Sequence, residues 1–304
     1  MNNNELKKVL LIYAGSAEFT AKSFNKWVNN FFELQMMAQV EPYFLFAGTG
    51  ADITWQLAQD ISKLIKEKYK HYNGFVIIHS LDNLIYTSSL VSFMIQKITK
   101  PVIFTCVALP GNREKFKKTS EVKHLPLENF ELLAFKSNVI SCIQMATMDI
   151  GEVAVAIGNN LVRAVKAKSN WQDINNYANN FKEDVIARIQ FGIQLTTAAR
   201  KRPNSALHFD LQYDNKVKLL ECYPGMVKEP ETTNDHGLFI KAYSGQQIPS
   251  NWHFSKDLIV YLYSAKESKL AWEVALAKFV WALGQTKDKQ KIKKLMSQNL
   301  AGEF

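Results

Sequence analysis

The chain has 304 residues, of which 47% are hydrophobic, with only 13 glycines and 8 prolines. This composition excludes a disordered or collagen-like chain and indicates a folded protein with a sizeable core. The formal net charge of +9 at pH 7 permits contact with polyanions. No uncharged apolar stretch reaches the ~18 residues that a membrane-spanning helix needs.

Apolar strands and helical patterns alternate over the first half of the chain. The predicted strands are 9–13, 42–46, 74–79, 101–105 and 152–157, and the predicted helices are 23–40, 53–69, 84–98 and 138–148. Asp52 is the predicted N-cap of the second helix. The alternation predicts an α/β fold with a doubly wound parallel sheet.

The pattern turns polar around residues 187–205, where the sequence AARKRPNSA is typical of a linker. Further strands are predicted at 217–222, 237–243 and 258–263, and helices at 270–283 and 288–298. We therefore predict a larger N-terminal domain over 1–190, a linker over 191–212 and a smaller α/β domain over 213–304.

The three cysteines Cys106, Cys142 and Cys222 are odd in number and widely spaced. This usage favours reduced thiols and a cytoplasmic protein. Each cysteine is interpreted as a small buried hydrophobe. No cysteine lies near a second metal-ligand cysteine, so we predict no metal, and no other cofactor is expected.

Basic residues occur in four short runs, at 66–70, 113–118, 200–202 and 287–294. A nucleic-acid module usually combines such runs with an aromatic platform or a known motif, and neither is found. We interpret the runs as solvated surface, with a nucleic-acid or acidic partner as the alternative.

Polar and turn-forming residues follow the first and third strands, at Ala14–Glu18 and at His79–Asn83. Ligands of open parallel sheets bind outside the carboxyl ends of the strands. Asp82 could hold the ammonium group of a small ligand, could cap the helix that begins at Leu84, or could do both. His79 ends an apolar strand and is interpreted as a structural, hydrogen-bonded histidine.

Seven segments, taken in order, are similar to one known family. They are KKVLLIYAGSAEF, GFVIIHSLDNLIYTSSLVSFMIQKITKPVIFTCVALP, EVAVAIGNNLVRAVKAK, KLLECYPGM, YSGQQIP, AWEVALAKFVWALG and QNLAGEF. In this order the chain resembles a bacterial type I L-asparaginase of the asparaginase/glutaminase family along nearly its whole length. The resemblance implies the two-domain asparaginase fold and a homodimer or homotetramer.

The resemblance also assigns site positions, several of which carry other residues here. The nucleophilic threonine of the family's TGGT turn corresponds to Ala17, and the threonine of its GTD motif corresponds to Leu81. The family's lysine corresponds to Ser169, with Lys168 one position away. Asp82 is kept. Because alanine has no nucleophilic atom, we expect the chemistry to be lost, with Ser16 and Lys168 as the candidate substitutes.

The family's serine-rich substrate clamp corresponds to the region of Gly48 and Thr49, without its carboxylate. The predicted ligand-binding residues are Gly15, Ser16, Gly48, Thr49, Ser80 and Asp82.

Three functions are consistent with these residues. The first is a non-catalytic or very weakly active homologue that binds an asparagine- or aspartate-like ligand. The second is an active amidohydrolase with a rearranged site, which converts L-asparagine to L-aspartate and ammonia. The third is a subunit of an amidotransferase-like assembly, with its lysine runs touching RNA.

Overall fold

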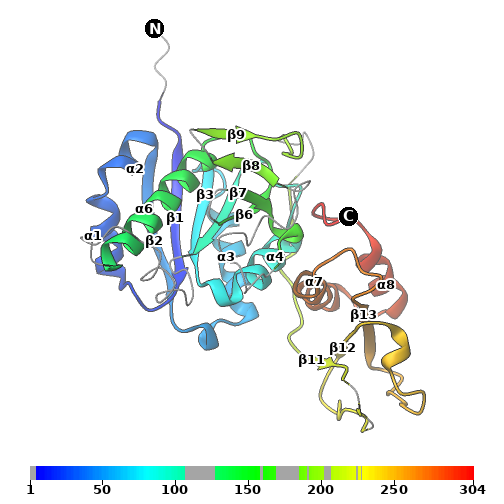
Figure 1. The fold of residues 1–304 in the computed structure, drawn as a ribbon. Helices are drawn as coiled ribbons and strands as arrows, with labels where there is room; N and C mark the ends of the chain where they lie inside the picture. The colour runs from blue at the N-terminus through cyan, green and yellow to red at the C-terminus, as the bar shows by residue number, and fades with distance from the viewer. Residues whose placement is uncertain are drawn as a thin grey trace.

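A computed structural model describes residues 5–106, 127–157, 160–168, 185–189, 192–201, 207–223, 225–226 and 228–304. Its centre is an eight-stranded sheet with the strand order β2-β1-β3-β5-β6-β7-β8-β9 (Figure 1). These strands are β1 (Lys8–Gly15), β2 (Gln39–Ala47), β3 (Gly74–His79), β5 (Val102–Cys106), β6 (Val153–Ile157), β7 (Asn160–Arg163), β8 (Val185–Ile189) and β9 (Ile193–Leu195). The predicted α/β fold with a large sheet is confirmed.

The sheet is mixed, because three strands that the sequence did not predict extend the predicted parallel strands. The strands from β2 to β6 in this order pair in parallel, whereas β7, β8 and β9 pair antiparallel. Only two residues separate β6 from β7. A parallel crossover needs a dozen residues or more, so this connection forces the chain to turn back.

Helices cover both faces of the sheet, as expected for a doubly wound fold. Alternate residues of β1 belong to different cores, with Leu10 and Ile12 in one and Val9 and Leu11 in the other. The first core includes α3 (Trp55–Lys68) and α4 (Leu84–Met94), and the second includes α1 (Ala21–Asn29), α2 (Phe32–Met37) and α6 (Leu127–Ala146). Burial on both sides explains why these strands are continuously apolar.

Two predicted helices were too long. The segment 23–40 is broken into α1 and α2, because α1 ends at its C-cap Asn30 and the chain enters β2 directly after Ala38. The segment 84–98 is helical only to Met94, and β4 (Ile95–Gln96) then pairs with β10 (His208–Phe209). In both segments, strand pairing with residues distant in the sequence therefore overrides the local helical pattern.

The C-terminal part contains a separate three-stranded parallel sheet, made of β11 (Val217–Glu221), β12 (Gly237–Ala242) and β13 (Ile259–Ser264). It is followed by α7 (Trp272–Gln285) and α8 (Lys289–Ser297). Phe279 of α7 packs on Phe239 of β12, while α7 also contacts α4 (Figure 1). The short 3-10 helices are Gly50–Asp52, Leu81–Asn83, Ala164–Lys166 and Gly245–Gln247.

The segment before this second sheet runs along α7. Trp281 Nε1 donates to the Asp210 carbonyl at 3.1 Å, and Gln285 Nε2 donates to the Gln212 carbonyl at 2.9 Å. The domain limits 1–190, 191–212 and 213–304 stay a prediction. In the described part of the chain, no helix is long and apolar enough to cross a bilayer.

A fully buried ion pair attaches the C-terminal residues to α7. Lys278 Nζ donates to Glu303 Oε1 at 2.6 Å and to the carbonyls of Met296 and Gln298 at 3.0 and 2.6 Å, and both charged side chains have 0% exposure. Burial lowers the pKa of Lys278, and the charge of Glu303 opposes that effect. Glu303 also accepts hydrogen bonds from the backbone N–H groups of Leu300 and Ala301.

We predict that Lys278→Met lowers the free energy of unfolding by about 3–5 kcal/mol, because Glu303 is left as an uncompensated buried charge. The double variant Lys278→Met with Glu303→Gln should lose less unfolding free energy than the sum of the losses in the two single variants, as measured by urea denaturation. Additivity of the single effects within about 0.5 kcal/mol would contradict this coupling.

His79 is a second buried polar group, at the end of β3. Its side chain is fully buried, and Nδ1 lies 2.7 Å from the Ser80 carbonyl oxygen. Burial lowers the pKa of His79 from 6.5 to about 4, an effect that the Ser80 hydrogen bond opposes. The imidazole is therefore neutral near pH 7, with Nδ1–H donating to the carbonyl. The sequence-based interpretation of a structural histidine agrees with these contacts.

The depressed pKa of His79 predicts a pH-dependent stability. The unfolded chain binds a proton at His79 below pH 6.5, but the folded chain does so only near pH 4. The stabilising contribution is complete above pH 6.5 and is lost as the pH falls toward 4. Between these pH values the wild type should lose up to about 3 kcal/mol more unfolding free energy than His79→Gln. Parallel pH profiles of the two proteins would show that His79 titrates normally.

Candidate functional site at the strand ends

The carboxyl ends of four adjacent parallel strands form the candidate site. In the order β2, β1, β3 and β5, these strands end at Ala47, Gly15, His79 and Cys106. Gly15 is in register with Ala47, and His79 is in register with Cys106. The Gly48 N–H donates to the Gly15 carbonyl at 3.1 Å, which joins the first two turns directly.

The turn after β1 is held by Tyr13. Its hydroxyl donates to the Ser16 carbonyl at 2.6 Å, and its ring stacks on Phe44 of β2 at 5.6 Å between centroids. Burial raises the pKa of Tyr13 to about 12, so the hydroxyl stays protonated and remains a donor. A Cβ atom on Gly15 would lie 3.4 Å from the His79 backbone, which is ordinary van der Waals contact.

The two side chains that follow Gly15 differ in accessibility. The Ser16 Oγ atom is buried and has no hydrogen-bond partner among the described residues. Ala17 is exposed and presents only a methyl group. The turn therefore offers one sequestered hydroxyl and no accessible nucleophile at position 17.

The turn after β2 is closed by Asp52, which is not the helix cap that the sequence predicts. Asp52 Oδ2 accepts hydrogen bonds from the N–H and the hydroxyl of Thr49, at 2.7 and 2.8 Å. Both bonds lower the pKa of Asp52. Helix α3 begins three residues later at Trp55, with Thr54 as its N-cap. Asp52 instead stabilises the 3-10 turn next to Gly48 and Thr49.

The turn after β3 brings Asp82 next to the turn after β2. Asn83 Nδ2 donates to the Gly50 carbonyl at 2.7 Å, and a Cβ atom on Gly50 would lie only 2.7 Å from Asp82 Oδ2. The Asp82 side chain is exposed. It does not cap α4, because Asn83 occupies the N-cap position and no side chain caps this helix. The helix-capping role considered for Asp82 is therefore not observed, and its ligand-binding role stays a prediction.

Leu81 points into the protein core beside α4. It is 5% exposed and belongs to the same apolar cluster as Leu84 and Ile85. Cys106, in register with His79, is buried, and burial raises the pKa of its thiol to about 12. A thiol with this pKa is protonated at neutral pH and is a poor nucleophile.

The structure thus brings together six predicted ligand-binding residues. Gly15, Ser16, Gly48, Thr49, Ser80 and Asp82 lie on three turns that hydrogen bonds connect. Lys168 is exposed and follows the 3-10 helix Ala164–Lys166, with no described contact to these turns. Ser169 lies outside the described residues. No group of metal-ligating side chains is found among the described residues.

An aromatic ladder that the sequence did not indicate connects this edge to the C-terminal sheet. Trp55 meets Tyr86 edge-on at 5.9 Å, and Tyr86 meets Trp272 edge-on at 5.7 Å. Lys241 Nζ lies 4.4 Å from the Trp272 ring centroid. The three rings occupy the first turns of α3, α4 and α7. The shared position of these aromatic residues in the first turn of their helices is the sequence pattern that could have indicated the ladder.

Comparison with known proteins agrees with this architecture. Residues 13–117 match the family model described as "Asparaginase, N-terminal". A glutamyl-tRNA(Gln) amidotransferase subunit of Pyrococcus horikoshii is 24% identical over 341 residues, covering 94% of this chain and 71% of that protein. The "L-asparaginase" of Thermococcus kodakarensis is 25% identical over 280 residues, covering 80% of each chain.

A solved structure extends the similarity to the whole fold. The crystal structure of L-asparaginase I from Vibrio cholerae superposes with a TM-score of 0.73 at 19% identity, covering 98% of this chain and 99% of that chain. Residues 13–117 thus match the N-terminal model of the asparaginase family, and the whole chain has the asparaginase-like α/β fold.

Proposed function

We propose that this protein binds a small amino-acid-like ligand at the strand ends and hydrolyses amides weakly or not at all. The proposal depends on the residues at the two positions where the resemblance places catalytic hydroxyl groups. Position 17 carries an exposed methyl group, and position 81 carries a buried leucine side chain. Neither group can attack a carbonyl carbon or transfer a proton.

The proposed ligand is asparagine- or aspartate-like, because of the charge at Asp82. This carboxylate is exposed and does not cap the following helix, so it is available to a ligand's ammonium group. The neighbouring Gly50 lets the turn after β2 approach Asp82, since a Cβ atom there would lie 2.7 Å from Asp82 Oδ2. Charge-assisted hydrogen bonds of this kind are roughly twice as strong as neutral ones.

The described residues offer poor substitutes for the missing hydroxyls. Ser16 Oγ is buried, and the neutral His79 ring is bound through Nδ1 to the Ser80 carbonyl. Lys168 has no described contact with the turns. The alternative is an active amidohydrolase with a rearranged site. The relatives that carry the name L-asparaginase favour this alternative.

A second candidate function is that of a subunit in an amidotransferase-like assembly. The relatives named as glutamyl-tRNA(Gln) amidotransferase subunits, which align with most of this chain, favour it. The net charge of +9 would suit contact with RNA. A mobility shift of tRNA by the purified protein at physiological salt would support this function, and its absence would favour the first proposal.

The proposal includes a bacterial type I, cytoplasmic protein that forms a homodimer or homotetramer. The three free cysteines suit a reducing compartment. Light scattering of the purified protein measures the oligomeric state directly.

The first experiment measures ammonia release from L-asparagine and L-glutamine, together with binding of L-aspartate and L-asparagine by calorimetry. We expect no release above background, and binding that Asp82→Asn weakens by about tenfold or more, as expected for one lost charge-assisted hydrogen bond. The matched control is Asp257→Asn, which removes an exposed carboxylate from a loop of the C-terminal part and should leave binding unchanged.

Two results would overturn the proposal. Ammonia release that is abolished by Asp82→Asn but not by Asp257→Asn would show an active amidohydrolase. Absence of binding by a folded sample, or equal binding by both variants, would show that Asp82 holds no amino-acid ligand.

A further inference from the structure

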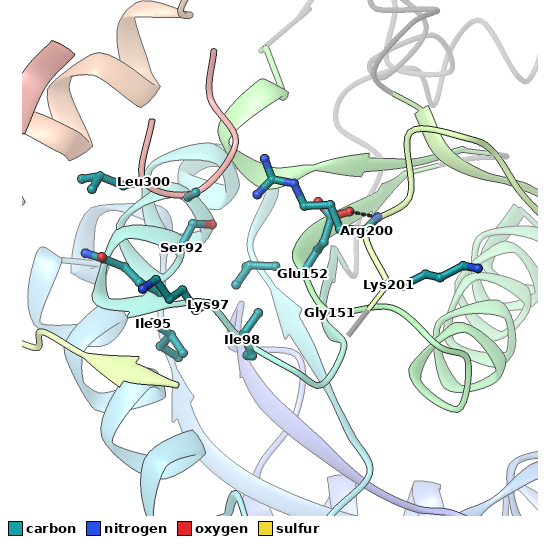
Figure 2. Close-up of a pocket in the computed structure, with 12 residues that line it drawn as sticks. Ser92, Ile95, Lys97, Ile98, Gly151, Glu152, Arg200, Lys201 and Leu300 are labelled. Carbon is teal, nitrogen blue, oxygen red and sulfur yellow. Dashed lines mark hydrogen bonds between the residues drawn. The ribbon is translucent and has the colours of Figure 1, made fainter. Parts of the chain in front are cut away.

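A pocket of about 150 Å³ lies at the opposite edge of the large sheet from the candidate site. Its walls come from the end of α4 and the residues after it, from Gly151–Val153 at the start of β6, from Arg200 and Lys201, and from Leu300 and Ala301 (Figure 2). Four segments distant in the sequence therefore meet here. Because β6 begins at this pocket, the pocket belongs to the amino ends of the strands.

The single acidic residue among the lining residues is already neutralised. Glu152 is 4% exposed, and its Oε2 accepts a charge-assisted hydrogen bond from Arg163 Nε. Its Oε1 accepts the backbone N–H of Arg200 at 2.6 Å, the bond drawn in Figure 2. The remaining charges of the lining are the cations Lys97, Arg200 and Lys201. The pocket is therefore electropositive.

Two of these cations are exposed side chains that have no protein partner among the described residues. In the described part of the chain, neither the Arg200 guanidinium nor the Lys97 ammonium makes a hydrogen bond or a salt bridge. Arg200 extends toward the C-terminal segment, and a Cβ atom on Gly302 would lie 2.5 Å from its Nη2 atom (Figure 2). The Lys201 side chain points away from Arg200, so it adds positive charge near the pocket but does not face Arg200 across it (Figure 2).

The pocket has an unusual backbone conformation at Lys97 and unfavourable electrostatics at Arg200, and a bound anion would offset the second. Lys97 has a φ of 54°, in the left-handed region that side-chain-bearing residues rarely adopt, and such residues cluster at functional sites. Burial and the neighbouring Arg163 charge lower the pKa of Arg200, opposed by Glu152 and Glu303.

We propose that this pocket binds a phosphate group, with the Arg200 guanidinium as its ligand and the Lys97 ammonium adding positive charge at the rim. A guanidinium presents paired N–H donors that match the oxygens of a phosphate, and an ammonium adds a point charge. A pocket of about 150 Å³ holds one such group together with a small organic substituent. This site is separate from the strand-end site and does not depend on the function proposed for it.

The test is calorimetric titration of the full-length protein with inorganic phosphate at constant ionic strength, with chloride as the balancing anion. We expect saturable binding that Arg200→Gln weakens by about tenfold or more, because a charge-assisted hydrogen-bonding partner is lost. Lys97→Gly should also weaken binding severalfold while keeping the fold, since glycine adopts positive φ without strain. Lys293→Ala removes one exposed charge from α8 and serves as the matched control.

The titration also identifies the source of the phosphate group. Tighter binding of glycerol phosphate than of inorganic phosphate would indicate a phosphorylated ligand, and the reverse would indicate free phosphate; both support the proposal. Three results would each overturn the proposal. They are absence of phosphate binding by the folded wild type, equal losses of affinity in all three variants, and binding of succinate as tightly as phosphate.

Discussion

β1 is hydrogen-bonded to β2 on one side and to β3 on the other, and it is buried on both faces of the sheet. Parallel pairing in this register places the ends of the three strands side by side. The turns at Gly15, Gly48 and Ser80 consequently meet at one edge, although up to 65 residues separate them (Gly15 to Ser80). The candidate site depends on this pairing for its shape, whereas its chemistry depends on the side chains at positions 17 and 81. The turns keep their shape with an alanine at position 17 and a leucine at position 81, because the hydrogen bonds that hold the turns do not use the side chains at these two positions.

Helix α4 connects the strand-end site to the electropositive pocket. It begins directly after Asp82 and Asn83 at the strand ends, and the residues that follow it, Ile95 to Ile98, line the pocket. The same helix packs against α7, which carries Lys278 of the buried Lys278–Glu303 pair. The C-terminal residues that this pair holds in place, Leu300 and Ala301, also line the pocket. The far end of the chain thus completes a surface of the N-terminal sheet.

Local patterns in the sequence were sufficient for much of the architecture. Continuous apolar runs such as Val9–Tyr13 and Gly74–His79 predicted strands buried on both faces, and their alternation with helices predicted the layered α/β fold. The position of Asp82 after such a run was enough to suggest a strand-end site. The inferences about the fold succeed because strand and helix periodicity and the geometry of parallel sheets are local or general properties of the chain, whereas the strand-end site stays a prediction.

Other features depend on contacts between distant segments, which periodicity does not record. The role of Asp52 depended on its bonds to Thr49, and the aromatic ladder depended on the packing of α7 beside α4. The antiparallel end of the sheet followed from a connection too short for a crossover. The pocket around Arg200 needed four separate segments to converge, so Arg200 and Lys201 of a basic run, although exposed as the sequence indicated, also line a pocket in the folded chain.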